Sequence, residues 1–306
     1  GMNHIQPGGT VLVAGASGLI GSRLTSELES RGYAVRRLVR RASTNPSEFT
    51  WDPAGRLLPR AALAGAQCVV VLSGAGVGDR RWTSSYRREI LSSRLSTVSL
   101  VAQRMAEVGE PTRLIAASAV GIYADRGEEE LTETSAPGQG FLAEVCRAWE
   151  AAADPARRAG LSVAHARTGL VLSARGGALG KLLPLIRAGV GGPMGTGTQW
   201  WPWITLADEV SALSHLVSSD VVGPVNLVAP HAERNGDLIR ALARGLNRPA
   251  ALPVPAIALR AAVGGFASEL TASQLVRPAV LESDGFEFLH PALGDALPSL
   301  LGTQRT

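Results

Sequence analysis

The chain has 306 residues, 30 basic and 26 acidic side chains, and an apolar content of 45%. This composition excludes a disordered chain, and no apolar run approaches the roughly 18 residues of a membrane span. Twenty-nine of the 30 basic residues are arginines, dispersed along the chain rather than gathered in one stripe, so no nucleic-acid partner is expected. The two cysteines, Cys68 and Cys146, cannot form a disulfide framework, so a cytoplasmic protein is expected.

Strand and helix patterns alternate through the first 170 residues. Short β-branched runs predict strands, and longer amphipathic stretches predict helices. The expected strands are Thr10–Ala14, Ala34–Val39, Glu48–Trp51, Cys68–Leu72, Arg113–Ala117 and Ser162–Ala166, and the expected helices are Gly18–Arg31, Ser84–Val108 and Leu142–Ala159. This alternation predicts an α/β fold of the Rossmann type, a doubly wound parallel sheet with helices on both faces.

The pattern changes after Ser173. Glycine and proline are dense over residues 176–202, around a short helix near Leu179–Arg187, and a further strand is expected at Pro224–Val228. Helical patterns dominate from Asn235 onward. The sequence therefore predicts a doubly wound domain over residues 1–173, completed by a return strand near 224–230, and a smaller mixed, mainly helical portion over 174–306.

A glycine-rich turn lies directly between the first strand and the first helix. Its sequence is GASGLIG, with glycines at Gly15, Gly18 and Gly21. Glycine permits a tight turn, close approach of a pyrophosphate to the backbone, and close packing of helix on strand. The start of the helix then presents free N–H groups to the phosphates. The turn predicts dinucleotide binding, with a purely structural turn as the alternative.

Two arginines follow the second strand, where a protein that prefers NAD usually carries an acidic residue for the ribose 2′-hydroxyl. Arg40 and Arg41 instead offer permanently charged, bidentate contacts to a 2′-phosphate. The alternative is a solvated strand end in an arginine-rich protein, which Arg36 and Arg37 nearby make credible. The sequence favours NADP(H) as the cofactor over NAD(H).

Several segments together resemble the atypical short-chain dehydrogenases/reductases, and within them the NAD(P)-dependent, sugar-nucleotide epimerase-like subgroup. The segments are GASGLIG, VVLSGAGVGDRRWT (70–83), SSRLST (92–97), SAVGIY (118–123), FLAEVCRAWEAAA (141–153), RTGLVLSARGGAL (167–179), WPWITLADEV (201–210) and VNLVAP (225–230). A last segment over 275–297 resembles the small C-terminal domain of unknown function typical of that subgroup, which we assign to residues 250–306. The resemblance covers nearly the whole chain and implies that residues 1–173 bind NAD(P).

The resemblance implies a cofactor cleft formed by the ends of strands. It implies contacts to the pyrophosphate from Gly15, Ser17, Gly18, Leu19, Ile20 and Gly21, and contacts to the 2′-phosphate from Arg40 and Arg41. It further places Trp51 and Asp52 on the adenine side, Leu72, Ser73 and Gly74 beneath the ribose, and Ala117 with Ser118 near the nicotinamide. Open α/β sheets bind ligands at such carboxyl ends. Core packing alone is the alternative for the strand-end segments.

The usual catalytic pair of the family is absent. Short-chain dehydrogenases carry Tyr-x-x-x-Lys on the helix after the fifth strand, and the tyrosine exchanges a proton with the substrate oxygen. The chain has one lysine, Lys181, and the residue four positions before it is Gly177. Alignment of the helix at Trp149 instead places Leu142 and Cys146 at the two positions. Neither side chain can replace the pair.

A few polar side chains remain as catalytic candidates. Ser118 matches the hydroxyl that would hydrogen-bond a substrate carbonyl in the family. Tyr123 is a candidate substitute acid, with an ordinary wall residue as the alternative. Asp208 is a second candidate, or it caps the helix that follows it. Cys146 is a reactive thiol or, as we favour, a packed helix residue. The scattered histidines lack metal-ligand spacing, so no metal is expected.

Two further groups could border the substrate. The aromatic cluster of Trp200, Trp201 and Trp203 forms either an apolar substrate wall or loop packing. The basic group of Arg80, Arg81, Arg87, Arg88 and Arg94 either neutralises an acidic substrate or, as we favour, coats a helix.

Three functions remain open at this point. The first is an NADP(H)-binding oxidoreductase that acts on a small carbonyl or alcohol substrate, with Ser118 on the reacting oxygen. The second is a nucleotide-sugar-type epimerase or other isomerase, and the third is a dinucleotide-sensing protein without turnover. Fold analogy cannot choose among them. The expected partner is one small-molecule substrate of unknown identity, and the expected assembly is a monomer or homodimer.

Overall fold

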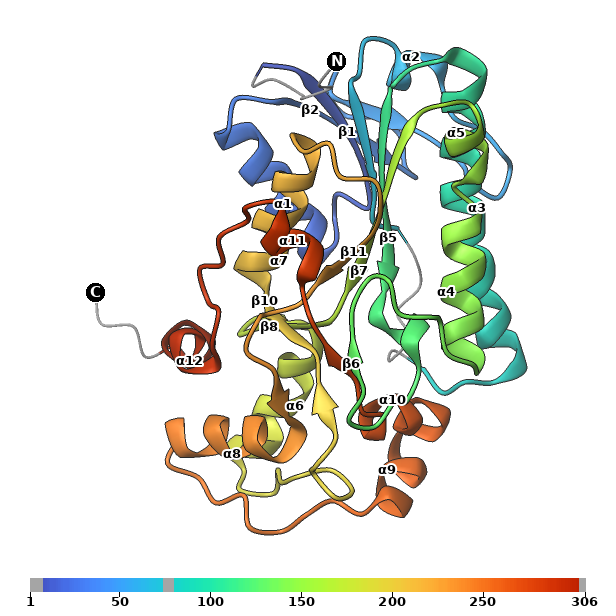
Figure 1. Cartoon of the computed structure of the whole chain (residues 1–306). Helices are drawn as coiled ribbons and strands as arrows, with labels where there is room; N and C mark the ends of the chain where they lie inside the picture. Colours follow the sequence, from blue (N-terminus) through green and yellow to red (C-terminus); the bar gives the residue numbers. More distant parts are fainter. Residues whose placement is uncertain (1–7, 74–79, 303–306) are drawn as a thin grey trace.

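A parallel sheet forms the centre of the molecule. The computed structural model describes residues 8–73 and 80–302. Within these residues, seven parallel strands pair in the order β11–β7–β5–β4–β1–β2–β3. Their bounds are β1 Thr10–Ala14, β2 Ala34–Val39, β3 Glu48–Thr50, β4 Cys68–Val71, β5 Arg113–Ala119, β7 Ser162–Thr168 and β11 Gly223–Leu227. The doubly wound Rossmann-type sheet predicted from the sequence is confirmed (Figure 1).

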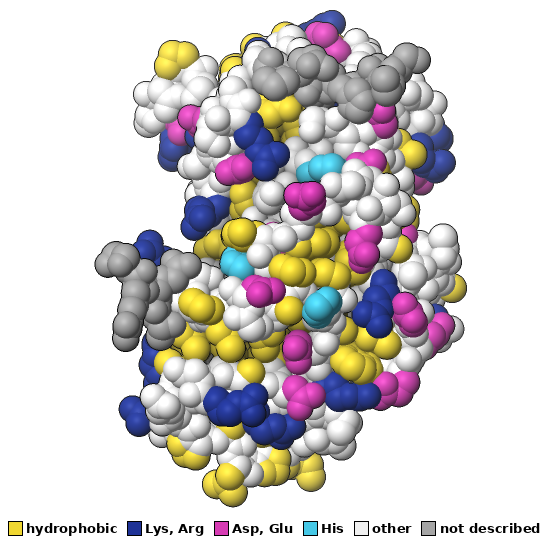
Figure 2. Space-filling model, turned by 60° about the vertical axis from the view of Figure 1, so that its left-hand side comes forward, with side chains coloured by type: hydrophobic (Ala, Val, Ile, Leu, Met, Phe, Trp, Pro, Cys, Tyr) yellow, Lys and Arg dark blue, Asp and Glu magenta, His cyan; other side chains and the backbone are white. Residues whose placement is uncertain are grey.

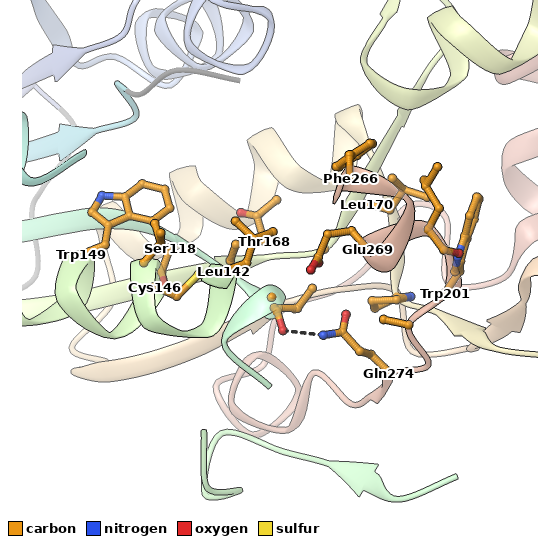
Figure 3. A pocket seen from close by; sticks show the side chains of 18 of the residues that line it. Ser118, Leu142, Cys146, Trp149, Thr168, Leu170, Trp201, Phe266, Glu269 and Gln274 are labelled. Carbon is orange, nitrogen blue, oxygen red and sulfur yellow. Dashed lines mark hydrogen bonds between the residues drawn. The ribbon is translucent and has the colours of Figure 1, made fainter. Parts of the chain in front are cut away.

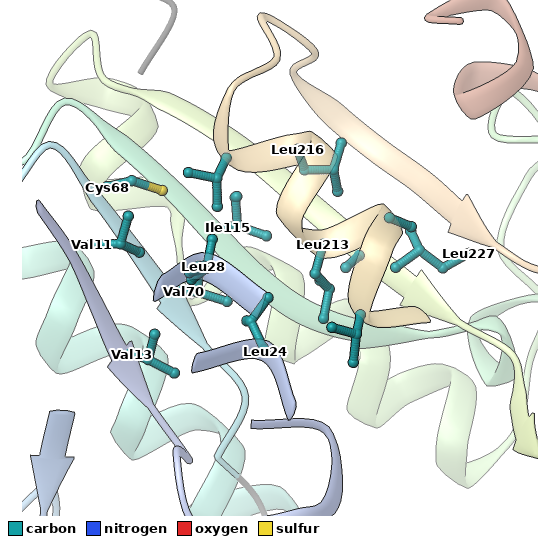
Figure 4. Close-up of a cluster of buried hydrophobic side chains, with 14 of the residues drawn as sticks. Val11, Val13, Leu24, Leu28, Cys68, Val70, Ile115, Leu213, Leu216 and Leu227 are labelled. Atoms are coloured by element: carbon teal, nitrogen blue, oxygen red, sulfur yellow. The ribbon is translucent and has the colours of Figure 1, made fainter. Parts of the chain in front are cut away.

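Helices cover both faces of this sheet. They are α1 (Leu19–Ser30) and α7 (Leu206–Val217) on one face, and α3 (Ser84–Val108), α4 (Phe141–Ala151) and α5 (Asp154–Arg158) on the other. Val13 of β1 packs in one hydrophobic cluster with Leu24 of α1 and Leu213 of α7 (Figure 4). Its neighbour Leu12 packs in a second cluster with Val101 of α3. The alternation of side chains along a strand thus supplies both cores. None of the described helices is long and apolar enough to span a membrane.

The helix expected over Leu142–Ala159 is instead two helices. The structure ends α4 at Ala151 and begins α5 at Asp154, with Pro155 in the first turn of α5. Proline has no N–H to donate and its ring crowds the preceding turn, so a continuous helix through this position is unfavourable. A short helix that was not predicted, α2 (Arg60–Leu63), precedes β4.

Most of the remaining elements pack at the carboxyl ends of the strands, whereas α11 (Ala279–Ser283) packs on the face of the sheet beside α7 (Figure 1). The helices are α6 Gly177–Arg187, α8 Asn235–Gly245, α9 Ala256–Val263, α10 Ala267–Thr271, α11 Ala279–Ser283 and α12 Leu293–Leu301. Short strand pairs connect them: β8 (Leu170–Ser173) with β10 (Trp203–Thr205), β9 (Trp200–Trp201) with β12 (Glu233–Arg234), and β6 (Glu130–Leu131) with β13 (Leu275–Val276). A third hydrophobic cluster, with Leu179 of α6, Leu238 of α8 and Leu300 of α12, forms their core. Although α7 falls in the range expected for this smaller portion, it packs on the sheet.

Charges are interspersed on the surface. On the face shown in Figure 2, basic and acidic side chains alternate rather than forming one basic patch. Many of the arginines form ion pairs with neighbouring carboxylates, such as Arg234 with Glu128 at 2.8 Å and Arg126 with Glu129 at 2.8 Å. The positive charge of these arginines is therefore balanced locally by neighbouring carboxylates.

Asp208 attaches the C-terminal segment to the sheet layer. Its carboxylate is 1% exposed and accepts hydrogen bonds from the backbone N–H groups of Leu289 (2.7 Å) and His290 (2.8 Å). The cap of α7 is Thr205, whose hydroxyl accepts from the N–H of Asp208 at 3.3 Å. Asp208 therefore does not cap the helix through its side chain, because Thr205 already occupies that position. It joins α7 to a segment 80 residues further along the chain.

We predict that Asp208→Asn lowers the free energy of unfolding by about 2 kcal/mol, because an amide offers one acceptor oxygen and turns its NH₂ group toward a second N–H donor. Urea denaturation monitored by circular dichroism measures the change. Asp237→Asn is the control, since Asp237 is exposed in the first turn of α8 and forms a surface ion pair with Arg240. Equal losses in the two variants would contradict the assigned role.

Candidate functional site

The glycine turn after β1 leaves its backbone open to a ligand. Gly15 has φ +86°, and a Cβ on it would lie 3.0 Å from the carbonyl carbon of Leu72 and from the nitrogen of Ser73. A Cβ on Gly21 would collide with the carbonyl oxygen of Gly15. These two glycines are thus required by the turn and by helix packing. A Cβ on Gly18 would meet only the Gly15 oxygen at 3.6 Å, so the described packing does not require glycine there.

The start of α1 is suited to an anion. No side chain caps the helix, and its first turn has no acidic residue. The first backbone N–H groups of α1 therefore have no acceptor within the helix, and they lie at the positive end of the helix dipole. Together with the open backbone at Gly18, this is the arrangement expected for a pyrophosphate.

A cavity of about 540 Å³ lies beside this turn, and we call it the β1–β2 cavity. Its lining residues are Gly15, Ala16, Ser17, Arg37, Leu38, Val39, Arg40, Arg41, Glu48, Trp51 and Ser73. The structure thus brings together six residues expected to bind cofactor: Gly15, Ser17, Arg40, Arg41, Trp51 and Ser73.

The two arginines of the β1–β2 cavity have different environments. Arg41 forms a bidentate pair with Glu48, with N–O distances of 2.9 and 2.6 Å. Arg41, with further hydrogen bonds from Thr44, lowers the pKa of Glu48 to about 2, so this carboxylate stays ionised. Arg40 is exposed and has no hydrogen-bond or ion-pair partner among the described residues. Arg40 is therefore the guanidinium available to a ligand.

The neighbouring arginines of β2 are engaged elsewhere. Arg36 donates to the carbonyls of Ala62 (3.0 Å) and Ala64 (2.6 Å) near α2. Arg37 pairs with Glu29 of α1 at 2.5 Å. Arg36 therefore serves packing of the fold, whereas Arg37 lines the β1–β2 cavity with its guanidinium already paired.

The other residues expected at the cofactor lie outside the lining of the β1–β2 cavity. Gly18, Leu19, Ile20 and Gly21 continue from the turn into α1, Leu72 precedes Ser73, and Asp52 is exposed and pairs with Leu57 in a local bridge. Ala117 packs against the second hydrophobic cluster. Gly74 lies outside the residues that the structure describes.

A second cavity, of about 330 Å³, lies at the ends of β5 and β7 (Figure 3), and we call it the β5–β7 cavity. Its walls are mainly apolar: Ala119, Val120, Leu142, Val145, Trp149, Leu170, Trp201, Pro202, Phe266, Leu270 and Ala272. Its polar or ionisable lining residues are Arg94, Ser118, Cys146, Thr168, Glu269 and Gln274. The walls come from the sheet, from α4 and from the C-terminal elements, so the cavity requires all three.

Both cavities lie along one edge of the sheet. The chain proceeds from β1 to β2 and β3 on one side, then returns to β4 on the other side of β1. Such a reversal of strand order opens the crevice in which doubly wound sheets bind ligands. Ser73 follows β4 at one cavity, and Ser118 of β5 lines the other.

Ser118 belongs to a hydrogen-bonded network behind the β5–β7 cavity. Its hydroxyl donates to Glu150 at 2.6 Å, and Arg167 donates to both oxygens of the same carboxylate at 2.9 and 3.0 Å. Burial opposes ionisation of Glu150, but the hydrogen bonds and charge of Arg167 outweigh it and lower the pKa. Because the hydroxyl hydrogen of Ser118 is donated to Glu150, the hydroxyl oxygen of Ser118 can act toward a ligand only as an acceptor. In this arrangement Ser118 does not donate to a substrate carbonyl.

Tyr123 continues the same network away from the cavity. It is fully buried, accepts from Arg167 at 3.0 Å and donates to Asn226 at 2.7 Å. Burial raises the pKa of its phenol. Tyr123 does not line the β5–β7 cavity, so the structure does not bring it together with Ser118 as a substitute acid.

Glu269 is the acidic side chain that the sequence did not single out. It lies on α10 and lines the β5–β7 cavity, where burial raises its pKa to about 7. One signal was available, because Glu269 is the only acidic residue between Asp237 and Glu282. This isolated position marks the residue in the sequence, but its place in the cavity depends on the fold.

The other candidates are divided between the cavity and the core. Of the three tryptophans in the loop, Trp201 lines the cavity, whereas Trp203 is buried in the third hydrophobic cluster and Trp200 lies under Arg234. Among the five arginines expected near the substrate, Arg94 lines the cavity. The thiol of Cys146 faces it, but burial raises its pKa to about 12, so it is not a reactive thiolate.

No metal site is present in the part of the chain that the structure describes, where no three His, Cys, Asp or Glu residues gather.

Comparison with known proteins agrees with this geometry. Residues 11–228 match the model of the NAD dependent epimerase/dehydratase family, and residues 254–300 match a domain of unknown function, DUF1731. The chain is 40% identical over 289 residues to the epimerase family protein Mb2239 of Mycobacterium bovis, covering 94% of this chain and 96% of that protein.

Two solved structures extend the comparison. Human epimerase family protein SDR39U1 (isoform 2), solved with NADPH, has a TM-score of 0.86 at 31% identity, covering 96% of this chain and 100% of that one. A nucleoside-diphosphate sugar epimerase from Corynebacterium glutamicum has a TM-score of 0.79 at 35% identity, covering 97% of this chain and 59% of that one. The family model, the relatives and the sheet with its glycine turn agree: this chain belongs to the NAD dependent epimerase/dehydratase family and is an SDR39U1-like atypical short-chain dehydrogenase/reductase with a C-terminal DUF1731 domain.

Proposed function

We propose that this protein is an NADP(H)-dependent oxidoreductase that acts on a small carbonyl or alcohol substrate. The observation that carries the proposal is the Arg40 guanidinium beside the glycine turn, in one cavity with Ser17 and Trp51 and without a partner among residues 8–73 and 80–302. The NADPH in the structure of the human relative supports the same cofactor. When bound, this cofactor would exchange a hydride with the substrate carbon.

The β1–β2 cavity and the adjoining start of α1 fit the phosphates of NADP(H). The open backbone at Gly18 and the uncapped start of α1 would hold the pyrophosphate. Arg40 would bind the 2′-phosphate. Glu48 is not available to a ribose 2′-hydroxyl as the acid of an NAD enzyme would be, since its oxygens already accept from Arg41 and Thr44. The site therefore favours a phosphate over a free ribose diol.

The β5–β7 cavity favours a substrate with an apolar body. Aromatic and aliphatic side chains form most of its described wall, and such walls recognise shape more than hydroxyl groups. A sugar would leave several hydroxyl groups in this cavity without hydrogen-bond partners, and the loss of their hydrogen bonds to water would weaken binding. Ser118, whose hydrogen is held by Glu150, would present an acceptor oxygen to the substrate. Trp201 is held in the wall by a hydrogen bond from its indole to the carbonyl of Leu270 at 3.0 Å.

We predict that Arg40→Ala raises the Kd for NADPH about tenfold and leaves the Kd for NADH within twofold, because one charge-assisted contact to the 2′-phosphate is lost. Fluorescence titration of both nucleotides measures this. Arg23→Ala is the control, since Arg23 is an exposed residue of α1 outside the β1–β2 cavity and its loss removes the same charge. Equal weakening of NADPH and NADH by Arg40→Ala would contradict the assignment.

We also predict that the protein consumes NADPH with apolar aldehydes or ketones at a kcat/KM at least tenfold above that for UDP-glucose or UDP-glucuronic acid. The reason is the apolar wall, since polar groups without partners weaken binding. Loss of absorbance at 340 nm across a carbonyl panel, with product analysis for the sugars, measures it. Interconversion of a nucleotide sugar without net NADPH consumption would favour an epimerase, and tight NADPH binding without any turnover would favour a sensor.

A further inference from the structure

The carboxyl group of Glu269 lies beside the position at which the family's tyrosine is missing. Leu142 stands at that position on α4. A Cβ on Gly121, in the turn after β5, would lie 3.6 Å from the Cβ of Leu142 and 3.8 Å from Oε2 of Glu269. Leu142 and the Glu269 carboxylate therefore contact the same point of the wall. Figure 3 shows the carboxylate directed into the cavity from α10, with Leu142 and Thr168 between it and Ser118.

The surroundings of Glu269 differ from those of a structural acid. Its carboxylate has no hydrogen-bond or ion-pair partner among the described residues. Its neighbours in the wall are mainly apolar and include Phe266 and Leu270. Glu269 is half-buried, and a carboxyl at such a position that serves stability is normally held by hydrogen-bond or ion-pair partners. Glu150 in the same cavity region illustrates this, with a bidentate arginine and a serine.

The charged and titratable groups around Glu269 are few. Arg94 of α3 and Cys146 of α4 line the same cavity, and Cys146 is a neutral thiol. The guanidinium of Arg94 lies over the ring of Trp149 at 4.8 Å and donates to the carbonyl of Ile90 at 3.2 Å. Arg81 donates to carbonyls of α9, at Ala261 and Ala262. Burial raises the pKa of Glu269 to about 7.

We propose that Glu269, supplied by the C-terminal domain, is the general acid and base of this site and takes the part of the absent tyrosine. The inference rests on the proposed oxidoreductase function and names its proton donor. In the reduction, a hydride adds to the carbonyl carbon, the π electron pair moves to the oxygen, and that oxygen takes the proton of the Glu269 carboxyl. Glu269 is left as a carboxylate, and the nicotinamide cofactor, which gave the hydride, is left oxidised. Oxidation of an alcohol runs the same steps in reverse.

The proposal gives the C-terminal domain a chemical role. Gln274 follows the end of α10 by three residues and lines the same wall. It donates to the carbonyls of Val120 (2.9 Å) and Ala124 (3.0 Å) in the turn after β5. Trp201 donates to the carbonyl of Leu270, the residue after Glu269. These bonds fix α10 against the sheet, so the carboxyl group keeps its place in the cavity.

The test is Glu269→Gln, which keeps size and polarity but cannot donate an acidic proton. We expect kcat for carbonyl reduction to fall about 100-fold, with the Kd for NADPH within twofold of the unaltered protein. In the unaltered protein kcat should fall above about pH 7, and this fall should be absent from the residual activity of the variant. Glu282→Gln is the control, since it removes an exposed carboxyl of the same C-terminal domain outside the cavity.

A second measurement needs no turnover. Because burial raises the pKa of Glu269 in the folded protein above its unfolded value, its contribution to stability is present at low pH and is lost as pH rises through the folded pKa. The Tm of the cofactor-free protein should therefore fall relative to that of Glu269→Gln between pH 5 and pH 8. The change should level off near the pH at which kcat falls, because above the folded pKa the carboxyl group is ionised in both the folded and the unfolded state.

The outcomes separate the two proposals. Unchanged kcat and an unchanged pH profile in Glu269→Gln overturn the role of Glu269 and leave the oxidoreductase function standing. A Tm difference between the two proteins that shows no change over pH 5 to 7, or that still grows well above the pH at which kcat falls, also overturns it. If the unaltered protein reduces no carbonyl with NADPH, the oxidoreductase function fails, and the role of Glu269 fails with it.

Discussion

The parallel register of the central sheet is the constraint on which both cavities depend. Ala14 of β1 pairs with Val71 of β4, and Val71 pairs with Ala116 of β5. Because the strands run in the same direction, the residues that follow these three emerge in one row at the same edge. The glycine turn, Ser73 and Ser118 therefore lie along a single line, although more than 100 residues of chain separate the first from the last.

This constraint explains which parts of the site the sequence predicts. The glycine turn and the arginines after β2 are local features, since a strand, a turn and a helix specify them within about 30 residues. The strand-end residues follow from the same logic, because any parallel sheet presents them at one edge. The buried runs TVLVA and CVVV are recognisable as central strands without knowledge of their neighbours.

Contacts between distant segments were not predictable in this way. The split between α4 and α5 was readable at Pro155, but the partners of Asp208 lie 80 residues away and depend on how the C-terminal segment docks. The division of labour between Arg40 and Arg41 depends on Glu48, which the loop between β2 and β3 brings back to the strand end. The position of Glu269 depends on the docking of the C-terminal domain, because α10 reaches the cavity only after this domain has packed against the sheet.

Two carboxyl groups near the same cavity show how environment assigns different tasks to one functional group. Glu150 is held by Arg167 and Ser118, which favour its charged form, so it remains a carboxylate that orders the wall. Glu269 has apolar neighbours that favour its neutral form. Separation of two pKa values by burial and by charge is the usual way in which an enzyme obtains an acid at neutral pH. A fold that has lost its tyrosine–lysine pair can recover a proton donor by this route, because a docked helix needs to bring only one unpaired carboxyl into the cavity.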